Sequence, residues 1–199
     1  MAGHGHPSIN FRTLFCFTWL SIFTMSSSAV CAASGMLLIA EENQINYVLL
    51  IRDRHDKHFE LPAGQNEKAG SLLDPKRVKE SDYETALRET VEETRGYLGR
   101  QQLINASQPI RQIHDGGFVL FLAKVRIFDL DEVRRIRIPE GNEKQWDPMR
   151  ETIDLAWVDI EQIRKSTDQK VIDRESRSIR IHKLLPRDIQ SAINLGWFQ

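Results

Sequence analysis

Short apolar runs separated by polar turns make up most of the chain after residue 34. Residues 36–40 and 47–51 are rich in leucine, isoleucine and valine, and the polar residues 41–44 between them predict a β-hairpin. Three further strands are expected, at residues 109–113, 118–125 and 155–158. Residues 62–64 predict a turn, and the charged, proline-containing residues 128–150 predict a long loop.

One segment, residues 79–95, has the 3.6-residue period of an amphipathic helix. One side of this helix collects its apolar and threonine positions, namely Tyr83, Ala86, Leu87, Thr90, Val91 and Thr94. Gly96 marks the expected stop, and further helices are predicted around residues 159–165 and 186–195. Strands before and after one strong helix, without regular βαβ alternation, predict a mixed α+β or sandwich arrangement.

Composition narrows the class of protein. The chain has 199 residues, of which 41% are hydrophobic, enough for one domain with a core. Its net charge of −1 gives no general attraction to polyanions, and because no continuous basic stripe accompanies it, no nucleic-acid partner is expected. Both cysteines, Cys16 and Cys31, precede residue 33. The remaining chain therefore has no disulfide scaffold, cysteine-ligated zinc or thiol nucleophile.

Residues 1–32 differ from the rest of the chain. They contain one charged residue, Arg12, which is followed by an apolar run at residues 13–25 and then by small residues. This order is typical of a secretory signal peptide, so we expect a secreted or periplasmic protein. Two alternatives stay open. The segment could remain as a membrane anchor, or a later start codon would leave the protein cytoplasmic.

The helix expected at residues 79–95 carries three carboxylates close together. At about 100° per residue, Glu89, Glu92 and Glu93 share an arc of about 100° opposite the apolar side. Like charges at this spacing repel one another, and a hard divalent cation such as Mg²⁺ or Mn²⁺ would relieve the repulsion. Arg88 would orient a neighbouring carboxylate. The alternative is a solvated acidic helix face, which is common.

The spacing of these residues resembles the Nudix box, G-x5-E-x7-R-E-U-x-E-E-x-G-U, in which U is aliphatic. The box is matched in type and mutual spacing by Glu80, Arg88, Glu89, Glu92 and Glu93. The preceding residues 61–64 are similar to the family's entry from strand to loop, with Gly64 as the box glycine. The likeness covers roughly residues 35–165, since the hairpin and the later strands come in the family's usual order.

Three departures from the box are specific. Fifteen residues, 65–79, separate Gly64 from Glu80 where the pattern has five, so the loop carries a ten-residue insertion. Thr90 occupies the aliphatic position. Arg95 stands where the box has glycine, and Gly96 follows one residue later. A longer surface loop costs little stability, and none of the departures removes a predicted metal ligand.

The resemblance implies a Nudix-like α/β/α sandwich with a mixed β-sheet, formed by residues 33–199 with the box at residues 64–96. It also implies hydrolysis, dependent on Mg²⁺ or Mn²⁺, of a diphosphate linkage in a nucleoside diphosphate-X or related phosphorylated metabolite. The expected partner is such a small substrate, and a membrane only if residues 1–32 stay attached. Substrate identity and oligomeric state stay open. The alternative is a catalytically idle Nudix-like domain that binds a phosphorylated ligand or a protein.

The resemblance also assigns roles to residues of the box. Glu89, Glu92 and Glu93 would hold the metal, which would neutralise the diphosphate and activate a water molecule. Glu92 and Glu93 are also assigned to catalysis. Arg88 and Glu80 would orient these carboxylates.

Substrate contacts and a late carboxylate complete the expected site. Arg52 and Arg54 end the second strand and would grip a phosphate, although an exposed strand-end arginine fits the pattern equally well. Gly64 is assigned to substrate binding with them. Family members often have a further carboxylate in a late loop, which serves as base or extra ligand. Glu151 is the first choice and Glu143 the second, each with an exposed loop acid as the alternative.

Overall fold

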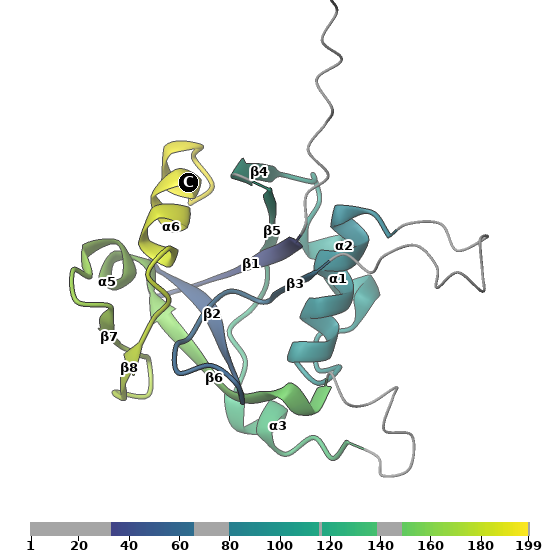
Figure 1. The fold of residues 1–199 in the computed structure, drawn as a ribbon, viewed down its shortest axis with the longest axis horizontal. Coiled ribbons are helices and arrows are strands. Elements are labelled where there is room, and N and C mark those ends of the chain that lie inside the picture. The colour runs from purple at the N-terminus through teal and green to yellow at the C-terminus, as the bar shows by residue number, and fades with distance from the viewer. Residues whose placement is uncertain (1–32, 66–79, 116, 139–148, 199) are drawn as a thin grey trace, which may run out of the picture.

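The computed structural model describes residues 33–65, 80–115, 117–138 and 149–198 (Figure 1). Its elements in chain order are β1 (Ala33–Glu42), β2 (Ile45–Asp53), β3 (Ala63–Gln65), α1 (Asp82–Glu93), α2 (Arg100–Ala106), β4 (Gln112–Asp115), β5 (Phe118–Lys124), α3 (Leu130–Arg134), β6 (Thr152–Asp159), α5 (Ile160–Lys165), β7 (Lys170–Ile172), β8 (Ser178–Arg180) and α6 (Leu185–Asn194). The main sheet has the order β4-β5-β1-β2-β6, with β3 paired to β1. It is mixed, because β1 runs parallel to β5 and antiparallel to β2.

The hairpin expected at the start of the body is confirmed. Ile39 of β1 pairs with Val48 of β2, and the turn between the strands is Asn43-Gln44, with φ of 52° and 65°. Two-residue turns with positive φ match the right-handed twist of the strands that they join. β1 thereby lies in the middle of the sheet, between β5 and β2.

Two apolar clusters enclose the main sheet. Leu37 of β1 belongs to the cluster that includes Ile163 of α5 and Ile189 of α6, whereas Leu38 belongs to the cluster that includes Leu87 of α1. Neighbouring residues of a strand point to opposite faces, so one strand contributes to both clusters. In Figure 1, α1 and α2 lie on one side of the sheet and α5 and α6 on the other. The predicted α+β fold with a mixed sheet between helical layers is confirmed.

Two predicted boundaries in the first half of the chain are wrong. Residues 62–64 do not form only a turn, because β3 begins at Ala63 and pairs antiparallel with β1, with Gly64 opposite Ser34. The strand expected at residues 109–113 begins instead at Gln112. Pro109 has no amide hydrogen to donate to a strand ladder, which moves the start of β4 beyond it.

The second half differs from the prediction in two places. The loop expected at residues 128–150 contains α3, which begins where the side chain of Asp129 accepts a hydrogen bond from the amide of Asp131, at 2.8 Å. The hairpin of β7 and β8 was not predicted, and strands of three residues are too short to show a clear period. The helices expected around residues 159–165 and 186–195 are confirmed as α5 and α6.

Some predictions concern residues outside the described ranges. These are the signal peptide at residues 1–32, most of the loop insertion at residues 66–79, and Glu143. They stay predictions. Among the helices of the described residues, none is long and apolar enough to cross a membrane.

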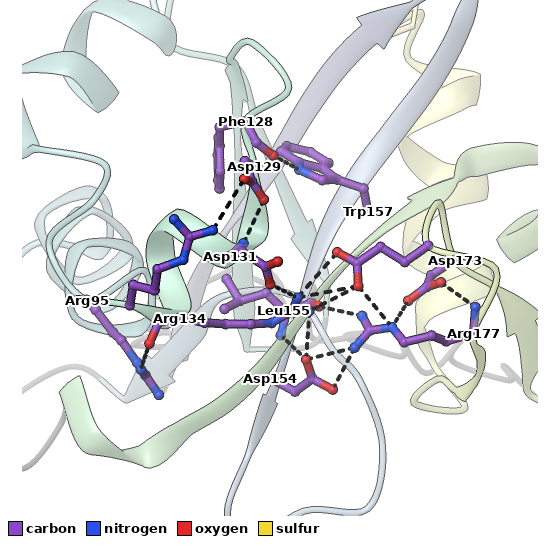
Figure 2. A network of polar contacts seen from close by, with 12 residues as sticks. Arg95, Phe128, Asp129, Asp131, Arg134, Asp154, Leu155, Trp157, Asp173 and Arg177 are labelled. Carbon is purple, nitrogen blue, oxygen red and sulfur yellow. Dashed lines mark hydrogen bonds and ion pairs between the residues drawn. The ribbon is translucent and has the colours of Figure 1, made fainter. Parts of the chain in front are cut away.

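Arginine side chains from two other segments brace the edge strand β6 (Figure 2). Arg134 of α3 and Arg177, which lies between β7 and β8, each donate to Asp154 Oδ1 at 3.1 Å. Both also donate to the carbonyl oxygen of Leu155, at 3.1 and 2.8 Å. The outermost strand of the sheet is therefore tied to α3 on one side and to the β7–β8 hairpin on the other.

We predict that Asp154→Asn lowers the free energy of unfolding by about 1–3 kcal/mol. The substitution removes the negative charge that two partly buried guanidinium groups share and leaves them only a neutral amide oxygen as their common acceptor. Urea denaturation of the full chain measures the change. Glu41→Gln is the matched control, because Glu41 is exposed on the same sheet, and it should leave the free energy of unfolding unchanged. Equal values for the two variants would contradict a stabilising role for the network.

Candidate active site

Glu89, Glu92 and Glu93 of the box lie on α1, and Glu80 directly precedes its first turn; we call these four residues the acidic group. Local hydrogen bonds define both ends of the helix. Ser81 begins the helix, since its side chain accepts a hydrogen bond from the amide of Glu84 at 3.2 Å. Arg95 and Gly96 end the helix with φ of 54° and 74°. The amide of Gly96 donates to the carbonyl oxygen of Val91 at 2.7 Å. The helix therefore stops one residue later than a box with glycine at position 95 would require.

Arg88 lies at the centre of the acidic group. Its Nη1 is 2.8 Å from Glu89 Oε1 and 3.0 Å from Glu92 Oε2, and its Nε is 3.2 Å from Glu80 Oε1. Its Nη2 also donates to the carbonyl oxygen of Gln65 at 3.3 Å. Burial alone lowers the pKa of Arg88, but the three carboxylates outweigh that effect and raise the pKa above its ordinary value. The sequence assigned Arg88 and Glu80 to orienting the glutamates. In the structure, Arg88 contacts Glu89 and Glu92, and Glu80 contacts Arg88.

The backbone of β3 lies close to Glu93 and Glu89. The amide of Ala63 donates to Glu93 Oε2 at 3.1 Å. A Cβ atom added to Gly64 would lie 1.9 Å from Glu89 Oε1. Gly64 was predicted to contact substrate, and the structure shows that its missing side chain makes room for the carboxylate of Glu89.

The pKa values in this group are shifted by burial and by like charges. Burial raises the pKa of Glu93 well above its usual value, and the charges of Glu89 and Glu60 raise it further. Burial also raises the pKa of Glu89, and Arg88 only partly offsets this. Burial is the main reason that Glu89 and Glu93 resist ionisation, and the neighbouring negative charges add to it, so a positive charge beside them would be favourable.

Glu60 and Asp53 act on this acidic group through their charges, although the sequence did not single them out. Burial raises the pKa of Glu60, and the charges of Asp56 and Asp53 add to the effect. Asp53 also acts on Glu93. The alternation of strand residues could have placed Asp53 on the same face as Ile51, which contacts the cluster around α1. No comparable signal exists for Glu60, because it lies between strands.

The structure does not bring Arg52 to the glutamates of α1. Its Nη2 is 3.6 Å from Asp154 Oδ2, and its guanidinium carbon lies 5.4 Å from the centre of the Phe59 ring. Arg54 is exposed and donates from its side chain to the carbonyl oxygen of Arg150. Of the two arginines predicted to bind phosphate, only Arg54 therefore presents a charge at the exposed end of β2.

Glu151 is exposed and stands directly before β6. Its carbonyl oxygen accepts a hydrogen bond from the amide of Arg54 at 2.9 Å, and the next residue, Thr152, pairs with Asp53 of β2. Glu151 thus lies at the same end of the sheet as Asp53. The structure shows no contact between the Glu151 side chain and the glutamates of α1 among the described residues.

The acidic group fits a hard divalent cation by the chemistry of its donors. Glu89, Glu92 and Glu93 offer only carboxylate oxygens, which Mg²⁺ and Mn²⁺ prefer. In the described part of the chain, no three His, Cys, Asp or Glu side chains converge as a ready metal site. Arg88 Nη1 instead pairs with Glu89 and Glu92.

A pocket of about 410 Å³ opens beside the acidic group. Glu60 and Ala63 line the pocket, and Ala63 also donates its amide to Glu93, so these two residues connect the pocket with the acidic group. Phe118 forms part of the wall because Gly35 has no side chain: a Cβ there would lie 3.0 Å from the Phe118 ring and 2.6 Å from the Ala63 Cβ. On the far side, the pocket is lined by Leu185 and Arg187 of α6 and by His182, which precedes this helix.

No family model matches the sequence, and no curated protein matches it. Solved structures similar to the chain include a C. elegans Ap4A hydrolase binary complex, at 17% identity and a TM-score of 0.45, covering 82% of this chain and 97% of that one. The Nudix domain of Shewanella oneidensis NrtR complexed with ADP ribose is similar at 15% identity and a TM-score of 0.46, covering 82% and 86%. A Nudix hydrolase from M. smegmatis, RenU, is similar at 14% and 0.39, covering 83% and 86%.

A mixed sheet between two helical layers is the arrangement that the resemblance to the Nudix box implies. The sheet, the strand β3 that leads into the box and the helix α1 that carries the box glutamates stand in the order that the resemblance implies. Identities of 17% and below leave the activity and substrate to be inferred from the residues of this chain.

We predict that Gly64→Ala weakens Mg²⁺ binding by about tenfold or more, which corresponds to about 1.4 kcal/mol. The backbone of Gly64 lies outside the left-handed region, so the added methyl group acts through its clash with the Glu89 carboxylate. Calorimetric titration with MgCl₂ measures the effect. Gly99→Ala is the matched control, because a Cβ at Gly99 meets no atom within 4 Å. Equal Mg²⁺ affinities for the two variants would exclude Glu89 from the metal site.

We also predict that Glu93→Gln stabilises the metal-free protein at mildly alkaline pH. Folding raises the pKa of Glu93, so its contribution to stability is fully present below the ordinary glutamate pKa and is lost as pH rises through the higher folded value. Glutamine keeps an oxygen for the Ala63 amide and carries no charge. The gain should therefore grow from acidic to alkaline pH in urea denaturation with a chelator. A gain independent of pH would show that the charge is not the cause.

Proposed function

We propose that the protein is a hydrolase, dependent on Mg²⁺ or Mn²⁺, of a diphosphate linkage in a nucleoside diphosphate-X or related phosphorylated metabolite. The observation that carries this proposal is the pair of partly buried glutamates, Glu89 and Glu93, which face the backbone of β3 with their pKa values raised. Partly buried like charges are costly for the fold on its own, and a bound cation would offset that cost.

Glu89, Glu92 and Glu93 would hold the cation. When bound, it would supply charge neutralisation for the diphosphate and lower the pKa of a bound water molecule. The chain's own residues would do the rest of the work. The amide of Ala63 fixes one oxygen of Glu93, and Glu80 keeps the guanidinium of Arg88 in place.

Glu151 stays our first candidate for the group that accepts a proton from the attacking water. It is exposed at the end of β6, next to the residue that pairs with Asp53, and so stands at the end of the sheet where the acidic group lies. Glu143 lies outside the described residues and stays the second candidate. Arg54 stays a candidate phosphate contact, because its charge is exposed at the same end of β2.

The 410 Å³ pocket would hold the group X or the nucleoside of the substrate. It shares Ala63 with the acidic group, so a diphosphate at the glutamates would direct one of its substituents into the pocket. The apolar residues Phe118 and Leu185 suit a flat or apolar group, and Arg187 suits an anionic one.

A catalytically idle domain is the second candidate, and one observation favours it. Arg88 pairs with Glu89 and Glu92, so part of the negative charge is already compensated without a metal.

The expected absence of a nucleic-acid partner stays a prediction, and a similar structure, Shewanella oneidensis NrtR, is described with a 27mer DNA. Export through residues 1–32 also stays a proposal, which N-terminal sequencing of the exported protein would test.

We predict that the full chain releases phosphate-containing products from at least one member of a diphosphate panel in Mg²⁺ or Mn²⁺. The panel would include ADP-ribose and Ap4A, a nucleoside diphosphate sugar and a non-nucleotide diphosphate. Glu93→Gln should lower kcat by at least about 100-fold because it removes a proposed metal ligand. Its circular dichroism spectrum should match that of the wild type. A wild type inactive on the whole panel would support the idle domain, and an active Glu93→Gln would remove Glu93 from catalysis.

A further inference from the structure

Arg95 occupies the position at which the Nudix box has glycine, in a backbone conformation that suits glycine. Its φ is 54°, in the left-handed region that residues with a Cβ rarely adopt. The next residue, Gly96, also has a positive φ, of 74°. The end of α1 therefore holds a long charged side chain where the backbone favours no side chain at all.

The Arg95 side chain joins two segments that are far from it in the sequence. Its Nη2 donates to the carbonyl oxygen of Thr152 at 2.7 Å, and its Nη1 donates to the carbonyl oxygen of Arg134 at 3.3 Å. Figure 2 shows the guanidinium of Arg95 beside the backbone of Arg134. One residue at the end of α1 thus ties down both the end of α3 and the first residue of β6.

The hydrogen bonds of the Arg95 side chain come with local costs to the stability of the fold. Within the described residues, Arg95 Nε and Thr152 Oγ1 are both buried without a hydrogen-bond partner. A buried polar atom without a partner destabilises the fold, and so does the left-handed backbone of Arg95. Glycine at this position would remove the strain and the unpaired Nε. Local costs of this kind are typical of sites where position matters more than stability.

The segments joined by Arg95 carry the two halves of the proposed active site. Glu92 and Glu93 lie on α1, three and two residues before Arg95, respectively. Thr152 pairs with Asp53, whose charge acts on Glu93, and Glu151 directly precedes Thr152. The guanidinium of Arg95 is therefore a direct link between the helix of proposed metal ligands and the sheet end that carries Asp53 and Glu151.

We propose that Arg95 is a positioning residue that sets the separation between the glutamates of α1 and the carboxylates at the β2–β6 end, and thereby sets kcat. This inference rests on the proposed function. Arg95 touches no substrate, and it acts through Thr152 and through the last turn of α1. Because the pocket at Phe118 and Arg187 lies on other elements, the loss of Arg95 should change kcat far more than KM.

The test uses the full chain with Arg95→Gly, Arg95→Lys and a matched control. Gln169→Gly serves as the control because Gln169 also has a left-handed backbone, with φ of 61°, and lies in the segment before β7, outside the candidate site. Arg95→Gly should lower kcat by about tenfold or more and leave KM within about twofold. Arg95→Lys should recover part of kcat, since its ammonium group can reach one carbonyl. Gln169→Gly should leave kcat and KM unchanged.

A second measurement separates this proposal from the proposed function. Amide hydrogen exchange of residues 152–154 should be several-fold faster in Arg95→Gly than in Gln169→Gly, whether or not a substrate is found. Equal exchange would overturn the proposal. So would an unchanged kcat in Arg95→Gly, or a change in KM as large as that in kcat. A wild type without activity but with faster exchange in Arg95→Gly would overturn the proposed function and retain the link itself.

Discussion

The proposed site depends on holding the negatively charged side chains of Glu89 and Glu93 close together beside β3. Glu89 and Glu93 would repel each other freely on an isolated helix, where like charges at this spacing cost a few tenths of a kcal/mol. Here they are partly buried, and burial makes the repulsion stronger. The fold opposes it with one amide, that of Ala63, and one guanidinium, that of Arg88. Both come from fixed positions, so the acidic group has a defined shape before any ligand binds.

The pairing of strands in the main sheet holds β3 close to α1. β3 has three residues and depends on its pairing with β1, which in turn lies between β5 and β2 in the middle of the sheet. Asp53, whose charge acts on Glu93, pairs with Thr152 of the edge strand β6. Arg134 and Arg177 hold this strand in place through Asp154. The acidic group is thus supported from the centre of the sheet and from its edge, by pairing in one case and by ion pairs in the other.

Sequence patterns predicted those parts of the site whose residues are neighbours in the chain. The helical period identified α1, and the spacing from Glu80 to Glu93 identified the acidic group, because both follow from local geometry. The role of Gly64 was assigned to substrate, since only the folded chain shows Glu89 lying against it. Glu60 was missed for the same reason. Arg95 stood out as a departure from the box, but the sequence does not reveal that its partners are Thr152 and Arg134.

The geometry of Arg88 bears on whether the acidic group can accept a cation. Arg88 compensates Glu89 and Glu92 through one atom, Nη1, whereas its Nε and Nη2 are held by Glu80 and by the carbonyl oxygen of Gln65. A cation that took over Glu89 and Glu92 would therefore leave Arg88 with a carboxylate and a carbonyl partner rather than unpaired. Losing every partner would impose the full cost of an uncompensated, partly buried charge. Glu80 thus has a second importance beyond orienting Arg88, because it makes the exchange of arginine for metal energetically feasible.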